Sequence, residues 1–274
     1  MNKLIARIII ATMFMPYLGS KSYAQKEETV QMRIHYATRF YMYEGQETKQ
    51  FDETILDIGK SMSHFYSLNS VHRDLITDSI AAKGGSMGDI LNALEMSNYP
   101  KTNWHSQVWK NYPSPNMLTF TDKAINRFQY TETMKRPKWT MSAKDSVIAD
   151  YKCQQAETLY QGRKWTVWFT LEIPVREGPW KLYGLPGLIL YAEDSDHLFS
   201  FSCIQIENVK GTKFHYPSKK HIQCSKEEYN ELIRLKWKDP VAFSEKITGF
   251  RGESYGLDGK TISYPERTAI LLDN

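Results

Sequence analysis

The sequence predicts an α+β fold in which a few helices pack on a curved, half-barrel-like antiparallel β-sheet. Apolar and polar residues alternate along many short stretches, and this two-residue period is typical of half-buried strands. Most connections between these stretches are too short to contain a crossover helix, which indicates an antiparallel meander. A helical period appears in only a few segments. Together these observations favour one sheet with helices packed on it over a parallel α/β architecture.

The N-terminal half begins with strands and then becomes helical. Apolar residues alternate strictly over residues 30–36, which predicts a half-buried strand. Two shorter strands are expected at residues 55–58 and 64–67. The period then changes, and a Gly84-Gly85 break separates two predicted helices at residues 73–83 and 87–96.

The middle of the chain returns to strands. Residues 97–115 are rich in Asn, Pro and aromatic residues and are interpreted as a loop, and residues 117–121 and 128–133 then form a hairpin. Four further strands are expected at residues 146–156, 165–171, 188–193 and 198–209.

One helix is predicted near the C-terminal end. Ser225 and Glu228 match a capping box, and the helix should run through Trp237 and stop at Asp239-Pro240. The tail from Gly249 onward contains glycines and polar residues and is expected to be loosely held.

Residues 1–24 have the pattern of a cleavable signal peptide. Lys3 and Arg7 precede an apolar run at residues 8–19, and Ser22-Tyr23-Ala24 provides small residues before the predicted cleavage after Ala24. The apolar run is too short to span a bilayer, which needs about 20 residues. We therefore expect a periplasmic or otherwise exported protein whose residues 25–274 form a single domain.

The net charge of the mature chain does not indicate a nucleic-acid-binding protein. Removing Lys3, Arg7 and Lys21 from 35 basic residues leaves 32 against 31 acidic residues. No later apolar run reaches transmembrane length, so an integral membrane protein is not expected.

The most specific motif is the hexapeptide Gly-Leu-Pro-Gly-Leu-Ile at residues 184–189, which lies in a longer block from Trp168 to Leu190. This block resembles the GLPGLI family of envelope proteins from Bacteroidota-type bacteria, a family without an established biochemical activity. The resemblance implies an envelope protein and a partner such as an outer-membrane transport system. It implies no cofactor, and it leaves the oligomeric state open.

Two interpretations of this block remain open. In the first, turn chemistry builds a rigid corner from Gly178, Pro179, Gly184 and Gly187. In the second, the block forms an apolar lip or groove for a ligand or partner, beside the strand at residues 165–171. The candidate binding residues are Trp168, Trp180, Lys181, Leu185, Pro186 and Leu188. We expect a non-enzymatic binding or accessory module, with no catalytic residue in the block.

A serine hydrolase is the first alternative function. Gly84-Gly85-Ser86-Met87-Gly88 matches the G-x-S-x-G nucleophile elbow, which requires a strand before the serine and a helix after it. The preceding residues have a helical pattern, so Ser86 is better interpreted as a helix N-cap with Asp89 three residues later.

A copper-binding protein is the second alternative. Met62 and His64 are two residues apart and would share one face of a strand, where they could hold a soft ion such as Cu(I).

The aromatic cluster around Trp104, His105 and Trp109 could stack on a sugar, dock a peptide or cover a sheet edge.

Three cysteines, Cys153, Cys203 and Cys224, leave the thiol state open. One disulfide with one free thiol is compatible with an oxidising compartment. Cys153 and Cys203 lie among apolar strand positions, which favours buried reduced thiols.

Overall fold

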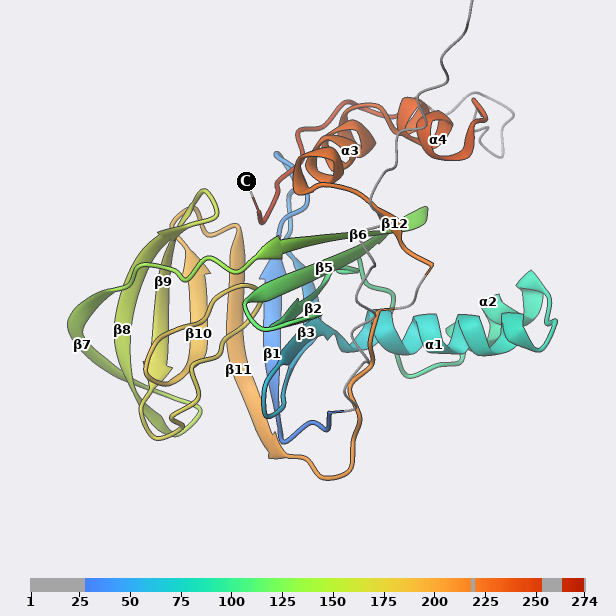
Figure 1. Ribbon diagram of the computed structural model, residues 1–274. Coiled ribbons are helices and arrows are strands. Elements are labelled where there is room, and N and C mark those ends of the chain that lie inside the picture. The colour runs from blue at the N-terminus through green and yellow to red at the C-terminus, as the bar shows by residue number, and fades with distance from the viewer. Residues whose placement is uncertain (1–27, 218–219, 253–262, 274) are drawn as a thin grey trace, which may run out of the picture.

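The computed structural model describes residues 28–217, 220–252 and 263–273. These residues form one 12-stranded sheet in the order β12-β6-β5-β4-β3-β2-β1-β11-β10-β9-β8-β7. The sheet is strongly curled and four helices accompany it in the described ranges, so the predicted α+β class with a curved antiparallel sheet is confirmed (Figure 1). The predicted signal peptide lies outside the described residues.

The strands are β1 (Met32–Phe40), β2 (Gln50–Ile58), β3 (Ser63–Ser67), β4 (Gln107–Lys110), β5 (Met117–Ala124), β6 (Asn126–Thr133), β7 (Thr140–Ile148), β8 (Tyr151–Tyr160), β9 (Arg163–Thr170), β10 (Leu188–Asp194), β11 (Phe199–Asn208) and β12 (Ile222–Gln223). The helices are α1 (Leu68–Ala82), α2 (Met87–Glu95), α3 (Lys226–Lys238) and α4 (Pro240–Thr248). None of these helices is long and apolar enough to cross a membrane.

The sheet consists of two antiparallel meanders joined by one long-range pair of strands. β1 to β6 pair in sequence order, and so do β7 to β11. β11 then pairs antiparallel with β1 from Met32↔Asn208 to Phe40↔Phe199. The short β12 adds to β6 as the one parallel pair among the described strands.

The core fills the concave side of the curled sheet. Helix α3 lies over the open end of this concavity, whereas α1 and α2 extend away from the sheet as an arm (Figure 1). Tyr229 and Leu232 of α3 belong to the main apolar core, so this helix packs against the sheet interior. Residues 263–273 return to the sheet, where the Ile270 N–H donates to the Met42 carbonyl at 2.9 Å.

Two segments differ from the sequence prediction in how strands are divided. The predicted loop at 97–115 contains β4, whose four residues are too few to show an alternating pattern although they pair with both β3 and β5. The single strand predicted at 146–156 is a hairpin, because Ala149 and Asp150 adopt positive φ angles of 48° and 67°. Ala-Asp is not one of the residue pairs that mark such a turn in a sequence.

The three predicted helices are confirmed with one shift, and α4 is a further helix that the sequence analysis does not predict. α1 begins at Leu68 rather than residue 73, because the Ser67 side chain caps it by accepting from the Ser70 N–H at 3.0 Å. The capping box of Ser225 and Glu228 at α3 is confirmed. The expectation of a loose C-terminal tail is wrong for its described end, since Leu271 and Asp273 are buried.

The signature block forms a tight corner between β9 and β10. Gly184 has a φ of +96°, which favours glycine, and a Cβ on Gly178 would lie 2.8 Å from the Ile189 side chain. A Cβ on Gly187 would lie 1.9 Å from the backbone oxygen of Thr170. The corner therefore needs glycine at these positions for backbone conformation and for close packing.

We expect Gly187→Ala to lower the free energy of unfolding by about 3 kcal/mol or more, because the clash is with backbone rather than with a flexible side chain. Urea denaturation followed by tryptophan fluorescence measures this loss. The control is Gly88→Ala in α2, where the nearest atom to the new Cβ is 3.6 Å away. That change should stabilise the chain by up to about 1 kcal/mol. An equal effect of the two substitutions would contradict the packing argument.

Candidate functional site

The residues of the signature block lie on different sides of the sheet. Trp168 is half-buried and lines an open groove together with Tyr191 and Glu193. Trp180 and Lys181 are fully buried in the interior. Leu185 and Leu188 are buried in the main core, whereas Pro186 is exposed. The structure thus does not bring these six candidate residues to one surface.

The interior beside the signature block is filled by the protein's own side chains. Trp165, Val167 and Phe169 on β9 are fully buried there, and the Trp165 ring lies 6.2 Å from that of Phe201. A cavity lies farther along the concave face, beneath α3.

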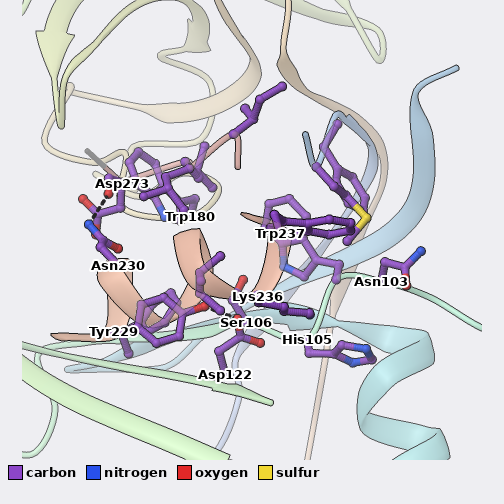
Figure 2. A pocket seen from close by; sticks show the side chains of 18 of the residues that line it. Asn103, His105, Ser106, Asp122, Trp180, Tyr229, Asn230, Lys236, Trp237 and Asp273 are labelled. Atoms are coloured by element: carbon purple, nitrogen blue, oxygen red, sulfur yellow. Dashed lines mark hydrogen bonds between the residues drawn. The ribbon is translucent and has the colours of Figure 1, made fainter. Parts of the chain in front are cut away.

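This cavity has a volume of about 130 Å³. It lies between α3, the loop before β4, the end of β1 and residues 270–273, above the concave face of the sheet (Figure 2). Its aromatic lining consists of Phe40, Tyr41, Trp104, Phe120, Tyr130, Trp180, Tyr229 and Trp237. Its polar lining includes Asn103, His105, Ser106, Asp122, Asn230, Lys236 and Asp273.

Trp180 connects the signature block to the cavity. Its ring centroid lies 5.6 Å from that of Trp165 and 6.1 Å from that of Tyr160, so the indole is fixed against β8 and β9. Its backbone has a φ of 51°, which a non-glycine residue rarely adopts. The corner therefore places one aromatic wall of the cavity and holds it rigidly.

Lys181, the next residue, is the centre of a buried ionic network. Its Nζ pairs with carboxylate oxygens of Glu132 and Asp273, and the Tyr130 hydroxyl lies 3.2 Å away. Lys226 of α3 also pairs with Asp273, at 2.7 Å. Burial alone would raise the pKa of Asp273, but these two lysines outweigh it and lower that pKa. The network joins the signature block, β6, α3 and the C-terminal segment.

A second buried lysine holds the signature block from its other side. Lys110 of β4 donates from Nζ to the Gly178 carbonyl at 2.9 Å and pairs with Glu177 at 2.5 Å. Burial lowers the pKa of Lys110, and the neighbouring Glu177 carboxylate opposes that shift. The corner is thus fixed by two ammonium groups, that of its own Lys181 and that of Lys110 from β4.

Asp122 is the central polar group of the cavity. It accepts from the Tyr229 hydroxyl and, at 2.6 Å, from the Lys123 N–H. In the part of the chain that the structure describes, no lysine or arginine forms an ion pair with it. Burial raises the pKa of Asp122, although the hydrogen bond from Tyr229 opposes this shift. Figure 2 shows Asp122 near Ser106 and Lys236, on the side away from Trp180.

His105 lies beside Asp122 but does not form a working triad with a serine. Its Nδ1 is 2.9 Å from the Ser70 Oγ, and burial lowers the pKa of the imidazole. Ser70 is buried at the start of α1 and does not line the cavity. The Ser70–His105–Asp122 group therefore presents no nucleophile to a molecule in the cavity.

The structure places Ser86 at a helix start rather than at a nucleophile elbow. Helix α1 and the Gly84-Gly85 turn precede it, so no strand leads into the serine. Its Oγ accepts from the Asp89 N–H at 3.2 Å, and the Asp89 side chain accepts from the Ser86 N–H at 2.8 Å. This is the capping box that stabilises the first turn of α2.

Met62 and His64 lie in packed surroundings. Met62 belongs to a small apolar cluster with Val30, Trp109 and Phe214. His64 stacks on Trp109 with ring centroids 4.2 Å apart, and burial lowers its pKa to about 3. Within residues 28–217, 220–252 and 263–273, no three His, Cys, Asp or Glu side chains gather where they could hold a metal ion.

All three cysteines are free in the structure. Cys153 and Cys203 are buried, and burial raises the pKa of each thiol to about 11. Cys224 is partly exposed.

Comparisons with known proteins give no function. Residues 123–191, about a quarter of the chain, match the model of a protein family of unknown function named Porph_ging. No curated protein matches. Two solved structures of PNGF-II, in different space groups, superpose with TM-scores of 0.49 and 0.46 at 13% identity. The matched regions cover 74% and 75% of this chain but only 33% and 32% of the two PNGF-II chains. The chain therefore spans about a third of the length of those proteins, and a similarity of this size carries no functional information.

Three residues of the cavity lining stand out in the sequence, although the groove expected from it lay beside the strand at residues 165–171. Trp104 and His105 stood out as an aromatic cluster, and Trp180 as part of the signature block. Asp122, Tyr229 and Asp273 carried no such signal, because each is a single residue that only the tertiary fold brings to the cavity.

We expect Lys181→Met to lower the free energy of unfolding by about 3–5 kcal/mol, because it leaves the carboxylates of Glu132 and Asp273 without their buried cation. The control is Lys164→Met, which removes an exposed 3.1 Å ion pair with Glu157 and should cost about 1 kcal/mol or less. Urea denaturation of both variants compares the losses. Similar small losses would show that the buried network does not stabilise the fold.

We expect Asp122→Asn to raise the melting temperature by about 2–4 °C at pH 7, which corresponds to about 1 kcal/mol for a chain of this size. The cause is that the fold raises the pKa of Asp122 and so disfavours its carboxylate. The gain should be complete above the raised folded pKa and should vanish below the ordinary value of 3.8. Thermal melts between pH 3 and pH 8 check this, and a loss of stability at pH 7 would contradict it.

Proposed function

We propose that this chain is an exported, non-enzymatic binding module of the cell envelope that holds a small ligand in the cavity beneath α3. The observation that carries the proposal is the cavity itself. It keeps open space between aromatic walls and the carboxyl group of Asp122, which forms no ion pair with a described residue. Pockets with mainly apolar walls and a few convergent polar groups are typical ligand sites.

The unfavourable environment of the Asp122 carboxylate supports this proposal. Asp122 is half-buried, and its burial raises the pKa of the carboxyl group, which has no ion-pair partner among the described residues. Carboxyl groups with a pKa perturbed in this way are concentrated at functional sites. The Trp180 wall is likewise held in an unfavourable backbone conformation. Both features lie in the lining of the same cavity.

The cellular setting of the proposal rests on the sequence. The leader pattern at residues 1–24 supports export, with residues 25–274 as one domain. The Gly-Leu-Pro-Gly-Leu-Ile motif supports membership of the GLPGLI family. A partner in the envelope, such as an outer-membrane transport system, follows from that resemblance alone.

Native mass spectrometry of the chain purified from the periplasm, beside a denatured control, tests the binding function. We expect a small molecule that is lost on denaturation and an N-terminus at Gln25. Ser106→Trp should abolish co-purification, because Ser106 lines the cavity and the larger ring would fill its space. The control Ser79→Trp changes an exposed position on α1 that does not line the cavity and should retain the ligand. Retention by both variants would place the ligand elsewhere, and a clean apo mass of the wild type would contradict stable binding.

A further inference from the structure

The size of the cavity limits its occupant to about one ring. An engineered cavity of about 150 Å³ in another protein binds benzene, and the present cavity measures about 130 Å³. Lipid tails and oligomeric ligands are much larger than this space. Residues at the edge of the cavity, such as Asn103 and Trp237, remain partly exposed, so substituents of a bound ring could extend toward solvent.

The walls of the cavity favour a ring with flat faces. Trp104 is held edge-on against Phe40 at 5.0 Å, and Phe120 stacks on Tyr130 at 4.7 Å. Tyr229 of α3 closes on Phe120 at 5.1 Å. These fixed aromatic side chains offer apolar contact to the face of a planar or chair-shaped ring at little cost in conformational entropy.

One side of the cavity is polar and offers a hydrogen-bond acceptor to a ligand. The described residues that donate hydrogen bonds to Asp122 are both neutral donors, the Tyr229 hydroxyl and the Lys123 N–H. Each carboxylate oxygen can accept a second hydrogen bond, so acceptor capacity remains. Ser106 and His105 line the same side. A purely hydrocarbon ring would leave the remaining acceptor capacity of Asp122 unused.

The charges around the cavity balance one another. Asp273 is neutralised by Lys181 and Lys226. Asp122 and Lys236 then remain in the lining with opposite signs. One charge of each sign gives the lining no net preference for an anion or a cation, so a neutral molecule fits best.

We propose that the ligand is a neutral six-membered ring that bears hydroxyl groups, stacked between the aromatic walls and donating a hydroxyl hydrogen bond to Asp122. This proposal rests on the proposed binding function. The ring could belong to a sugar residue or to a phenol, since both present the same chemistry to Asp122.

The test is a titration of the mature chain with chosen probes, followed by the tryptophan indole N–H signals in NMR and by calorimetry. Glucose, galactose, mannose and N-acetylglucosamine represent sugars, and phenol represents phenolic rings. Benzene tests a ring without a hydroxyl group, and benzoate and glucuronate test anions. We expect phenol, a sugar or both to bind at least 10-fold more tightly than benzene and either anion.

Two variants separate hydroxyl recognition from a general effect on the cavity. Asp122→Leu should weaken binding of the hydroxylated probe at least 10-fold and should leave the affinity for benzene unchanged or increase it. Asp122→Asn, which still offers a carbonyl acceptor, should retain most of the binding and shows that the fold tolerates a change at this position.

Each of the other outcomes contradicts the ligand class, the binding function or the role of Asp122. If benzene or an anion binds best in the cavity, the hydroxylated-ring proposal fails and the binding function stands. If no probe shifts the indole signals and the chain from the periplasm carries no ligand, the binding function fails as well. If a hydroxylated probe binds equally to wild type and Asp122→Leu, the role of Asp122 is wrong.

Discussion

Burying the ammonium group of Lys181 is the constraint on which the rest of the structure depends. A charge removed from water requires opposite charges and hydrogen bonds at close range. Here they come from β6 through Glu132 and Tyr130, and from the C-terminal segment through Asp273. Lys226 and Asn230 of α3 bind the same segment, through the Asp273 carboxylate and its backbone carbonyl. Satisfying one cation therefore draws four separate parts of the chain together at one end of the sheet.

The cavity is a by-product of this arrangement that the neighbouring residues preserve. The ionic network positions α3 above the concave face, and the rigid corner positions Trp180 below it. Aromatic side chains of fixed conformation fill most of the space between them. Asp122 faces the space that is left, without an ion-pair partner among the described residues. A site made in this way has a fixed aromatic wall at Trp180 and one polar contact that a ligand can complete.

The sequence predicts the fold class well because alternation is a local property of each strand. Residues 30–36, 165–171 and 198–209 show it clearly, and the caps at Ser86 and Ser225 are equally local. β4 and the β7–β8 turn were missed because four residues show no period and Ala149-Asp150 is not a typical turn pair. The sequence does not predict this cavity, although Trp180 and the Trp104-His105 cluster in its lining stand out in the sequence. Its other groups, Asp122, Tyr229 and Asp273, come from β5, α3 and the C-terminal segment, and no local pattern brings them together.

The pairing of β1 with β11 has a consequence for how the chain folds. Strands β1 to β6 each pair with a strand that is adjacent in the sequence. The outer edge of β1, in contrast, has no partner until β11 is available. The intervening chain is long, so closing this pair costs entropy and should slow folding. During that interval the exposed edge of β1 is a place where a second chain could pair and aggregate. The strand order therefore leaves one edge of the first meander open to pairing with other strands until the second meander is in place.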